Sequence, residues 1–537
     1  MLHLLVAAAL TLPADIDPDA GAVILDAEKY LDPFQADYGF QQAIDEVARR
    51  GGGIVKLPPG QFELRRGLVL RDWVELAGAG IGTTVLRPQR QVERLEVLSV
   101  REHRNKACTV YVDHIPLELR VGSAVVACEQ FPFPPPERTK PRPCIVTAIH
   151  RVGNWLTLKA PYGICALEPG KGCLMFGDAA ALERDVHKGD MEIALRDASL
   201  FRRGDQLTLG APGNEVLAHA FVREVYGNTL ILEAPVQIDF PAWPAADTVG
   251  ATKVDALVFA VFPMLHGADL HGSSVSDLTI QGRGFARAGT TQNRWSLSGI
   301  HLYNATEVRV ERVAVHDWPA DGISLQAGTR CKVANCVVTG SHQNGIHPGT
   351  GLTNSLFLEN VCQRNNAGFY FCWDNVGHVV RGNEFTENDY GGIVGLGNPR
   401  DASNLIEENV VARNGRVGIE INGGGQSNNV LRANTVEDNS QKFPGQYAGI
   451  SLYSLGDGAQ RYQIVKNVIR DTQRVPTQHI GVAEEPGADG NTVKDNTFSG
   501  HERADVIVAG KNTKVEGSPG AKVRRWQITK PARPKAG

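Results

Sequence analysis

The sequence predicts an all-β solenoid, because a glycine followed by a hydrophobic residue recurs through the second half of the chain. The successive spacings are 23, 23, 23, 24, 26, 31 and 32 residues. A repeat of this length matches one coil of a solenoid, in which each coil packs only on its neighbours. The pairs are Gly299-Ile300, Gly322-Ile323, Gly345-Ile346, Gly368-Phe369, Gly392-Ile393, Gly418-Ile419, Gly449-Ile450 and Gly481-Val482.

A second repeat places an asparagine after a strand-like segment of each coil. Asparagine is tolerated at turns, and its amide can hydrogen-bond the same amide in the next coil. The sequence therefore predicts two structural asparagine ladders, and each member of the second lies five residues after a member of the first. The first comprises Asn335, Asn360, Asn383, Asn409, Asn434, Asn467 and Asn496, and the second Asn365, Asn388, Asn414 and Asn439.

Residues 30–100 predict an N-terminal cap and the first coils. Within them, residues 38–50 place apolar side chains on one face of a helix, a run of three glycines ends it, and Leu-Pro-Pro-Gly-Gln-Phe-Glu-Leu follows. Together with the repeats, these features resemble the pectin-lyase-like superfamily. That resemblance implies a right-handed parallel β-helix with an N-terminal helical cap. The apolar face consists of Phe40, Ala43, Ile44 and Val47.

Residues 101–250 interrupt the repeat and contain a duplication. Gly-Asn-Trp-Leu-Thr-Leu-Lys-Ala-Pro at 153–161 matches Gly-Asn-Thr-Leu-Ile-Leu-Glu-Ala-Pro at 227–235. Alternating apolar residues and turn signals predict two small inserted β-modules. The coil repeats occupy residues 251–515, and the basic residues of 516–537 predict a solvated C-terminal tail.

Composition restricts the classes of function and the location. A formal net charge of -4 lacks the basic excess of a nucleic-acid-binding protein. Residues 1–14 resemble a secretory signal peptide, and no later segment is long and apolar enough to span a bilayer. We therefore expect a secreted or periplasmic protein that binds neither nucleic acid nor a membrane. Among nine cysteines, Cys128 and Cys144 are candidates for a local disulfide.

Strand alternation turns the residue after each repeated hydrophobe outward, so that equal positions of successive coils form a stripe. Its polar and aromatic residues concentrate in the coils from 299 to 374. Exposed rings beside hydrogen-bonding groups suit a sugar chain, so we expect a polysaccharide partner to lie along this stripe. The predicted substrate-binding residues are His301, Tyr303, Ser324, Gln326, His342, Asn344, Trp373, Asp374 and Glu420.

The most specific catalytic candidate is His347. Pro348 and Gly349 follow it and distort the strand where other coils continue regularly, and unusual backbone collects at functional sites. Tyr370 occupies the matching position of the next coil, and Asp321 lies in the preceding one. We predict that His347 is a general base, that Tyr370 is the acid, and that Asp321 orients the imidazole.

This set favours proton abstraction at C5 of a uronate, the opening step of polysaccharide lyases and of C5-epimerases. An arginine such as Arg330, Arg364 or Arg381 would neutralise the sugar carboxylate. Residues 344–348 are similar in shape to the Tyr-Gly-hydrophobic-Asp-Pro-His site of alginate epimerases, but differ at the Tyr, Asp and His. No cofactor or metal ligand is expected, because no spacing requires a divalent cation such as calcium.

Two other functions stay open. A glycoside hydrolase needs two carboxylates about 5 Å or about 6.5–9.5 Å apart, and the candidate pairs are Asp321 with Asp317 and Asp374 with Asp389. The adjacent Asp-Asp, Gly-His-Gly and Arg-Ile-Lys motifs of polygalacturonases do not occur in the sequence. The remaining function is a non-catalytic carbohydrate-binding or adhesion solenoid, which would more typically show an even aromatic stripe.

Overall fold

The protein is described by a computed structural model that covers residues 23–31, 36–89, 93–102, 107–129, 142–159, 172–177, 179–210, 217–239, 257–259, 262–282, 295–398, 400–426 and 428–526. It divides into two compact units. The first is Met1–Ser324 with Thr339–Gln343, and the second is Leu325–Val338 with Asn344–Gly537. The predicted signal peptide lies outside the described residues.

The first unit begins with a helix that packs on the first coils. Helix α2 (Ala36–Arg49) buries Phe40, Ala43, Ile44 and Val47, the face expected from the sequence. The ring of Phe40 meets the edge of Phe62 at 5.0 Å between centroids. The helix contacts β1 (Val23–Asp26), β2 (Gly53–Lys56), β3 (Gly60–Leu64), β4 (Leu68–Val69) and β5 (Val74–Ala77). The predicted N-terminal helix is thus present and covers apolar coil surface.

Parallel strands continue from this cap. Strand β19 pairs with β4 and β21, while β20 pairs with β5, β6 and β22. Short 3-10 helices precede or join the strands of this unit. The bounds are β6 (Thr84–Pro88), β19 (Leu265–Ala268), β20 (Ser274–Gln281), β21 (Ile300–Thr306), β22 (Arg309–His316), η2 (Ala27–Tyr30), η3 (Arg151–Gly153) and η4 (Trp295–Leu297).

In the region where the sequence predicted two inserted modules, the first unit contains a closed barrel and a separate six-stranded sheet. The barrel comprises β7 (Glu93–Glu102), β8 (Ala107–Val112), β9 (Ala124–Glu129), β10 (Arg142–His150), β11 (Trp155–Lys159) and β12 (Gly172–Phe176). The sheet comprises β13 (Ala179–Ala181), β14 (Glu192–Ala194), β15 (Gln206–Gly210), β16 (Leu217–Tyr226), β17 (Thr229–Leu232) and β18 (Leu257–Phe259).

The duplicated sequence forms the same hairpin in each module. Strands β10 and β11 pair antiparallel, as do β16 and β17, and both hairpins contain a register shift. Each turn has a left-handed residue, Asn154 in one and Gly227 in the other. Cys144 lies opposite Val125 on β9. The side chain of Cys128 lies outside the described residues, so the bridge between Cys128 and Cys144 stays a prediction.

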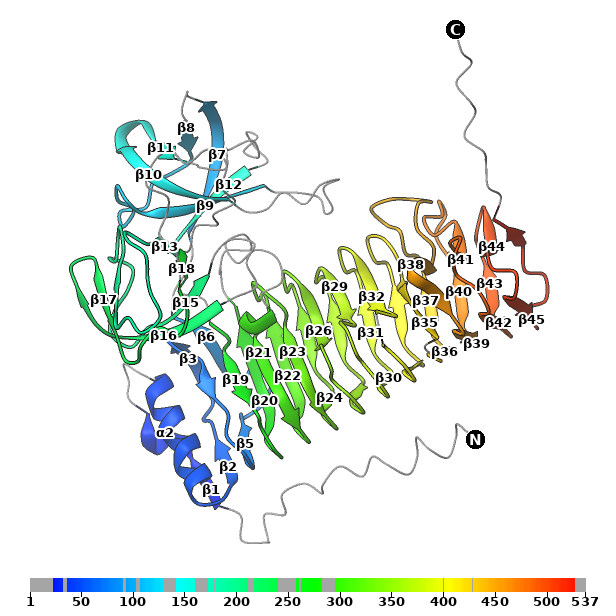
Figure 1. The fold of residues 1–537 in the computed structure, drawn as a ribbon, viewed down its shortest axis with the longest axis horizontal. Coiled ribbons are helices and arrows are strands. Elements are labelled where there is room, and N and C mark those ends of the chain that lie inside the picture. Colours follow the sequence, from blue (N-terminus) through cyan, green and yellow to red (C-terminus); the bar gives the residue numbers. More distant parts are fainter. Residues whose placement is uncertain are drawn as a thin grey trace. The chain divides into compact units, whose positions relative to one another are not determined.

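The second unit is a stack of parallel coils (Figure 1). One sheet carries the repeated hydrophobes, and its strands pair in order along the chain. These strands are β26 (Asn344–Gly349), β29 (Ala367–Tyr370), β32 (Gly391–Leu396), β35 (Ile419–Gln426), β38 (Ile450–Gln460), β41 (Ile480–Glu484), β44 (Ala504–Val508) and β46 (Val523–Arg525).

Short strands form the other sides of each coil. One side has β24 (Lys332–Ala334), β27 (Leu356–Leu358), β30 (Val379–Arg381), β33 (Leu405–Glu407), β36 (Val430–Arg432), β39 (Gln463–Val465), β42 (Thr492–Lys494) and β45 (Lys514–Glu516). Another has β28 (Val361–Gln363), β31 (Glu384–Thr386), β34 (Val410–Ala412), β37 (Thr435–Glu437), β40 (Val468–Arg470) and β43 (Thr497–Ser499). Strands β23 (Ile323–Thr329) and β25 (Val337–Thr339) contain residues of both units.

The repeated glycines are needed because successive coils approach closely there. A Cβ atom on Gly345 would lie 2.5 Å from the carbonyl oxygen of Gly368, and one on Gly368 would lie 2.7 Å from that of Gly392. The hydrophobic residue after each glycine is fully buried, as in Ile346 and Phe369. The repeat found in the sequence therefore combines a packing contact with a core side chain.

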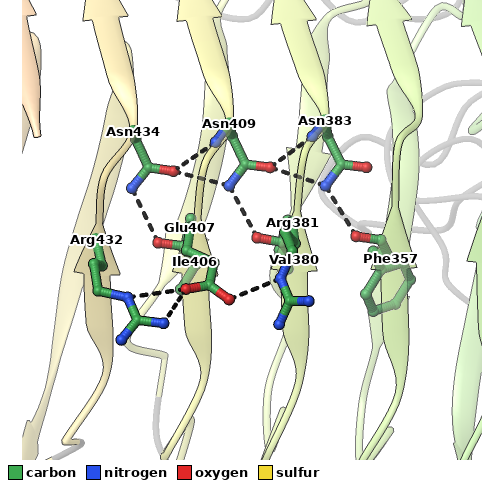
Figure 2. Close-up of polar contacts among 9 residues, drawn as sticks. All are labelled: Phe357, Val380, Arg381, Asn383, Ile406, Glu407, Asn409, Arg432 and Asn434. Carbon is green, nitrogen blue, oxygen red and sulfur yellow. Dashed lines mark hydrogen bonds and ion pairs between the residues drawn. The ribbon is translucent and has the colours of Figure 1, made fainter.

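The predicted asparagine ladder runs through buried corners of the coils, as Figure 2 shows for three members. The backbone N–H and the Nδ2 of Asn383 both donate to Oδ1 of Asn409 at 2.9 Å. Asn409 donates in the same way to Asn434, and its Nδ2 also donates to the carbonyl oxygen of Val380. Every polar atom of the Asn409 amide therefore has a partner in an adjacent coil.

The first predicted member of that ladder is wrong. Asn335 has a left-handed backbone with φ of 54°, and the next residue, Cys336, occupies the ladder position by donating its N–H to Asn360. The left-handed residue precedes the ladder residue in later coils too, as Glu408 precedes Asn409. The turn and the ladder are therefore made by neighbouring residues, whereas the sequence interpretation gave both roles to asparagine.

A further ladder was not predicted, because a histidine interrupts its asparagines. Nδ1 of His378 accepts from the N–H of Ser355 at 3.1 Å, and the N–H of His378 donates to Asn404 at 2.9 Å. Asn404 continues the ladder to Asn429. His378 is fully buried, and this burial lowers the pKa of its imidazole to about 3.

The C-terminal segment also differs from its prediction as a solvated tail from residue 516. Strand β46 lies within it and pairs in parallel with β44, with Val506 opposite Val523. All three residues of β46 are exposed, so the strand extends a sheet without adding core. Basic character alone did not reveal this pairing.

Replacing Asn409 with Ala should destabilise the second unit. The change leaves two buried donors of Asn383 without their acceptor, and each unsatisfied buried group costs about 1–3 kcal/mol. We expect the free energy of unfolding to fall by about 3 kcal/mol or more in urea titrations. Val410→Ala, on the exposed side of the adjacent strand, is the matched control and should change it by roughly 1 kcal/mol or less. Equal effects of the two changes would contradict the ladder's importance.

His378 should make stability depend on pH. Its imidazole has a pKa near 3 when folded but about 6.5 when unfolded, so between these values the unfolded chain binds the additional proton. The stability contributed by neutral His378 is fully present above pH 6.5 and is lost as pH falls, by roughly 3 kcal/mol at pH 4.5. His378→Asn, which imitates Asn404, should remove this part of the slope in urea titrations at pH 7.5 and 4.5. An unchanged slope would show that another group titrates.

Candidate functional site

The second unit presents a stripe of side chains on the outer face of the sheet that carries the repeated hydrophobes. Strand register aligns Tyr370 with Val394 and Glu420 with Ser451, and places His347 opposite Tyr370. We call His347, Tyr370, Val394, Glu420 and Ser451 the outward stripe. Because neighbouring strands lie about 4.8 Å apart, consecutive members are close enough to contact one molecule.

His347 and Tyr370 are brought into direct contact. Their ring centroids lie 4.9 Å apart with the rings nearly perpendicular, at 73°. His347 is only 5% exposed, while Tyr370 is half-buried. The contact joins two of the predicted catalytic residues on adjacent strands.

The backbone after His347 makes room for a predicted binding residue. A Cβ atom on Gly349 would lie 1.6 Å from Oε1 of Gln326, so the Gln326 side chain lies directly over this glycine. The carbonyl oxygen of Pro348 accepts the N–H of Cys372 at 3.1 Å. The Pro-Gly sequence thus serves packing around His347.

Cys372 is a neighbour of His347 that was not among the predicted site residues, although strand alternation turns it outward. Burial raises the pKa of its thiol, but hydrogen bonds with His347 and Thr350 and the charge of the imidazole outweigh burial, so the pKa lies below its usual value. The sulfur lies 3.7 Å from Oγ1 of Thr350. The signal was available, because Cys372 is two residues after Tyr370 and therefore points to the same face of the sheet.

Trp373 and Asp374 follow Cys372 in the turn after β29. Trp373 is 57% exposed, which suits a ring that stacks on a ligand. Asp374 instead accepts a hydrogen bond from Arg400 at 2.6 Å. Asp389 is held by Lys442 at 2.8 Å. The carboxylate pair considered for a hydrolase thus consists of two groups that are each bound to a cation.

Glu420 has a different set of partners. Tyr390 donates its hydroxyl proton to the Glu420 carboxylate, and both side chains are shielded from solvent. Burial raises the pKa of Glu420, although the Tyr390 hydrogen bond and the charge of Arg416 oppose it. Burial and the Glu420 charge also raise the pKa of the Tyr390 hydroxyl. Glu420 is therefore a carboxyl group in a desolvated, hydrogen-bonded setting.

Arg416 lies against three aromatic rings. Its guanidinium carbon is 4.9 Å from the ring centroid of Tyr390 and 5.5 Å from those of Phe443 and Tyr447. Sequence reasoning missed this cluster. Tyr390, Arg416 and Tyr447 each stand two residues before a repeat glycine, a phase that could have revealed it.

Three arginines were considered as neutralisers of a sugar carboxylate. Arg381 is committed to Glu407, which Arg432 also contacts (Figure 2). Arg364 lies 3.7 Å from Glu387. The Glu407 side chain is only 3% exposed, so its two partly exposed arginines neutralise a buried carboxylate. Arg330 has a left-handed backbone at a coil corner.

The remaining predicted residues differ in accessibility. Asp321 and Ser324 belong to the first unit and are fully buried, while Tyr303 and His342 of that unit are exposed. His301 is half-buried and lies opposite His266 in the parallel register. Asn344 of the second unit is half-buried at the start of β26. The predicted role of Asp321 in orienting His347 stays a prediction.

The described residues hold no group of three or more His, Cys, Asp or Glu side chains arranged to bind a metal ion. Within the same part of the chain, no helix has both the length and the apolar character needed to cross a bilayer.

Parallel coils, amide ladders and an outward-facing stripe define a right-handed parallel β-helix protein. The family described as "Right handed beta helix region" matches residues 298–460. The parallel β-helix fold predicted from the sequence is thereby confirmed. No curated protein matches this chain.

Several solved structures are similar over most of the chain. The A-module of mannuronan C-5 epimerase AlgE6 from Azotobacter vinelandii is 14% identical, with 94% of this chain and 100% of that one covered and a TM-score of 0.48. DFA-IIIase from Arthrobacter chlorophenolicus A6 is 11% identical, with 93% and 95% covered and a TM-score of 0.48. The adhesin PfbA of Streptococcus pneumoniae is 11% identical, with 94% and 100% covered and a TM-score of 0.42. Likenesses at this level carry no argument about activity.

Cys372 should react with iodoacetamide at a lower pH than an ordinary thiol. Because the hydrogen bond with His347 favours the thiolate, we expect the rate to reach half its maximum below the usual pKa of about 8.5. Mass spectrometry of the labelled peptide at a series of pH values measures this. His347→Ala should move the midpoint upward, and buried Cys362, whose pKa burial raises, should stay unlabelled. A midpoint that is unaffected by His347→Ala would contradict the pairing.

Proposed function

We propose that the protein is a polysaccharide lyase or C5-epimerase that acts on a uronate-containing glycan along the outward stripe. The observation that carries this proposal is the contact between His347 and Tyr370 on adjacent strands, at 4.9 Å between ring centroids. An imidazole and a phenol that touch on an outer sheet face can remove and supply protons at one sugar. Exposed Trp373 beside them supplies a surface for the sugar ring.

The proposed reaction begins when His347 removes the proton from C5 of the uronate. The electron pair of the broken C–H bond moves toward the carboxylate, whose negative charge must be stabilised. In a lyase, the C4–O4 bond then breaks, a C4–C5 double bond forms, and Tyr370 protonates the departing oxygen. In an epimerase, a proton returns to C5 from the opposite face. A phenol with a usual pKa of about 10 is protonated at neutral pH and can donate.

A glycoside hydrolase is less well supported. Of its candidate pairs, Asp374 and Asp389 are bound to Arg400 and Lys442. An acid that must give up a proton gains nothing from a neighbouring cation, which keeps it ionised. Glu420 has the raised pKa that a catalytic acid needs. It is held by the Tyr390 hydroxyl, and neither of the candidate carboxylate pairs includes it.

His347→Ala and Tyr370→Phe should each lower kcat by about 10²- to 10⁴-fold, the usual contribution of a general acid or base. Activity is measured on polyuronates by ultraviolet absorbance of the unsaturated product, by reducing ends, and by NMR for inversion at C5. Glu384→Gln, at the exposed first position of β31, is the control and should keep wild-type activity. Full activity of His347→Ala would contradict the assignment of His347 as the general base. Reducing ends without absorbance would instead indicate a hydrolase.

A further inference from the structure

The cluster around Arg416 has no role in the chemistry above, although two of its rings pack on the same buried residues as Tyr370, namely Ala367, Val394 and Val417. Its three rings, Tyr390, Phe443 and Tyr447, form what we call the aromatic platform. Phe443 and Tyr447 also meet each other, with centroids 5.9 Å apart and planes at 75°. All three rings and Arg416 are half-buried, so the guanidinium is held at the surface and not inside the core.

Arg416 differs from other arginines of the second unit in its partners. Arg381, Arg400 and Arg470 each donate to a carboxylate of a neighbouring coil. In contrast, Nε of Arg416 is buried and has no hydrogen-bond partner among the described residues. Its positive charge is felt at Glu420, where it favours the ionised carboxyl against burial. The aromatic platform thus fixes a guanidinium whose hydrogen-bonding capacity is not used within the described fold.

We propose that Arg416 and the aromatic platform form a subsite for the carboxylate of a uronate unit other than the reacting one. A guanidinium can donate two parallel hydrogen bonds to a carboxylate. Contacts with the rings hold the arginine in place before binding, which reduces the entropy lost when the ligand arrives. This inference rests on the proposed function for the position of the reacting sugar.

The place of Arg416 in the coil order explains why a different sugar would be bound. Arg416 immediately precedes β35, which is three strands along from β26 and His347 in the parallel sheet. At about 4.8 Å per strand this is roughly 14 Å. A carboxylate at Arg416 and a C5 proton at His347 therefore belong to separate units of one linear polymer. The subsite selects chains with a second acidic unit at a defined distance.

Half-buried rings can also contact the sugar itself. Tyr390 and Tyr447 pack on buried Ala367, Val394 and Val417, so only the parts of these rings that remain exposed can meet the C–H surface of the sugar, while the guanidinium takes the acidic group. The Glu420 carboxyl, which accepts the Tyr390 hydroxyl proton and whose pKa burial raises, also lies close to the cation.

Binding and kinetics with Arg416→Gln test the inference. The probes are oligomannuronates and oligogalacturonates of increasing length, together with the same oligomers reduced at the carboxyl groups. For long acidic oligomers we expect at least a tenfold weaker Kd and a similarly raised KM, with kcat at saturation nearly unchanged. The shortest oligomers and the reduced ones should bind the variant and the wild type equally. Raised salt should weaken binding to the wild type more than to the variant.

Matched variants separate binding from folding. Tyr447→Phe keeps the ring and should retain affinity, whereas Tyr447→Ala should lose part of it. Thermal unfolding is measured for each variant, because a purely structural Arg416 would lower Tm without changing Kd. That result would overturn the proposal. So would equal losses on acidic and reduced oligomers, or failure of the wild-type protein to bind either acidic series.

The two proposals can fail independently. Binding of the same oligomers is also measured by calorimetry in the His347→Ala variant, in which turnover does not interfere. Arg416-dependent binding of acidic oligomers, combined with no uronate product from wild-type protein, would support the subsite and overturn the proposed reaction. Turnover that requires His347 but ignores Arg416 at every oligomer length would support the reaction and overturn the subsite.

Discussion

The hydrogen bonds between buried amides of successive coils are the interaction on which the second unit depends. An unpaired amide in the interior is costly, so each ladder amide is stable only when the next coil stacks at hydrogen-bonding distance and in register. Asn409 satisfies its donors and acceptors with Asn383, Asn434 and Val380. Three ladders of this kind prevent each strand from slipping along its neighbour. Because the register is fixed, residues at equal positions of successive coils align on one face of the sheet.

This alignment sets the positions of the side chains in the candidate site. His347 and Tyr370 meet because their strands are held in register by groups that have no chemical role themselves. The repeat glycines tighten the stack further, since a Cβ on Gly345 would collide with the backbone of the next coil. Strand β26 continues past His347 through Pro348 and Gly349, which lie against the Gln326 side chain and the Cys372 N–H. The stacked coils therefore set the position of His347, and these neighbours form part of the environment of the imidazole.

Charge is used in two ways along the second unit. On the short strands, arginines and carboxylates neutralise each other, as Arg381 and Arg432 do with buried Glu407. Beside the outward stripe, Glu420 is paired with a phenol and Arg416 with aromatic rings. Opposite charges that are kept from forming a direct pair retain the capacity to interact with a ligand. This contrast separates structural ion pairs from residues that are available for recognition, and no single charge in the sequence reveals it.

The sequence by itself determined the coil period, the buried hydrophobes, the helical cap and most of the asparagine ladder, because each of these repeats at a fixed spacing. It also placed His347 and Tyr370 at matching positions. Only the tertiary structure decided which carboxylates are occupied by cations, that Cys336 and not Asn335 occupies its ladder position, and that Cys372 and Arg416 lie beside the stripe. These outcomes depend on contacts between residues about 25 positions apart, whose side-chain directions follow from turn geometry. Periodicity specifies the coil, whereas packing between coils decides the partner of each side chain.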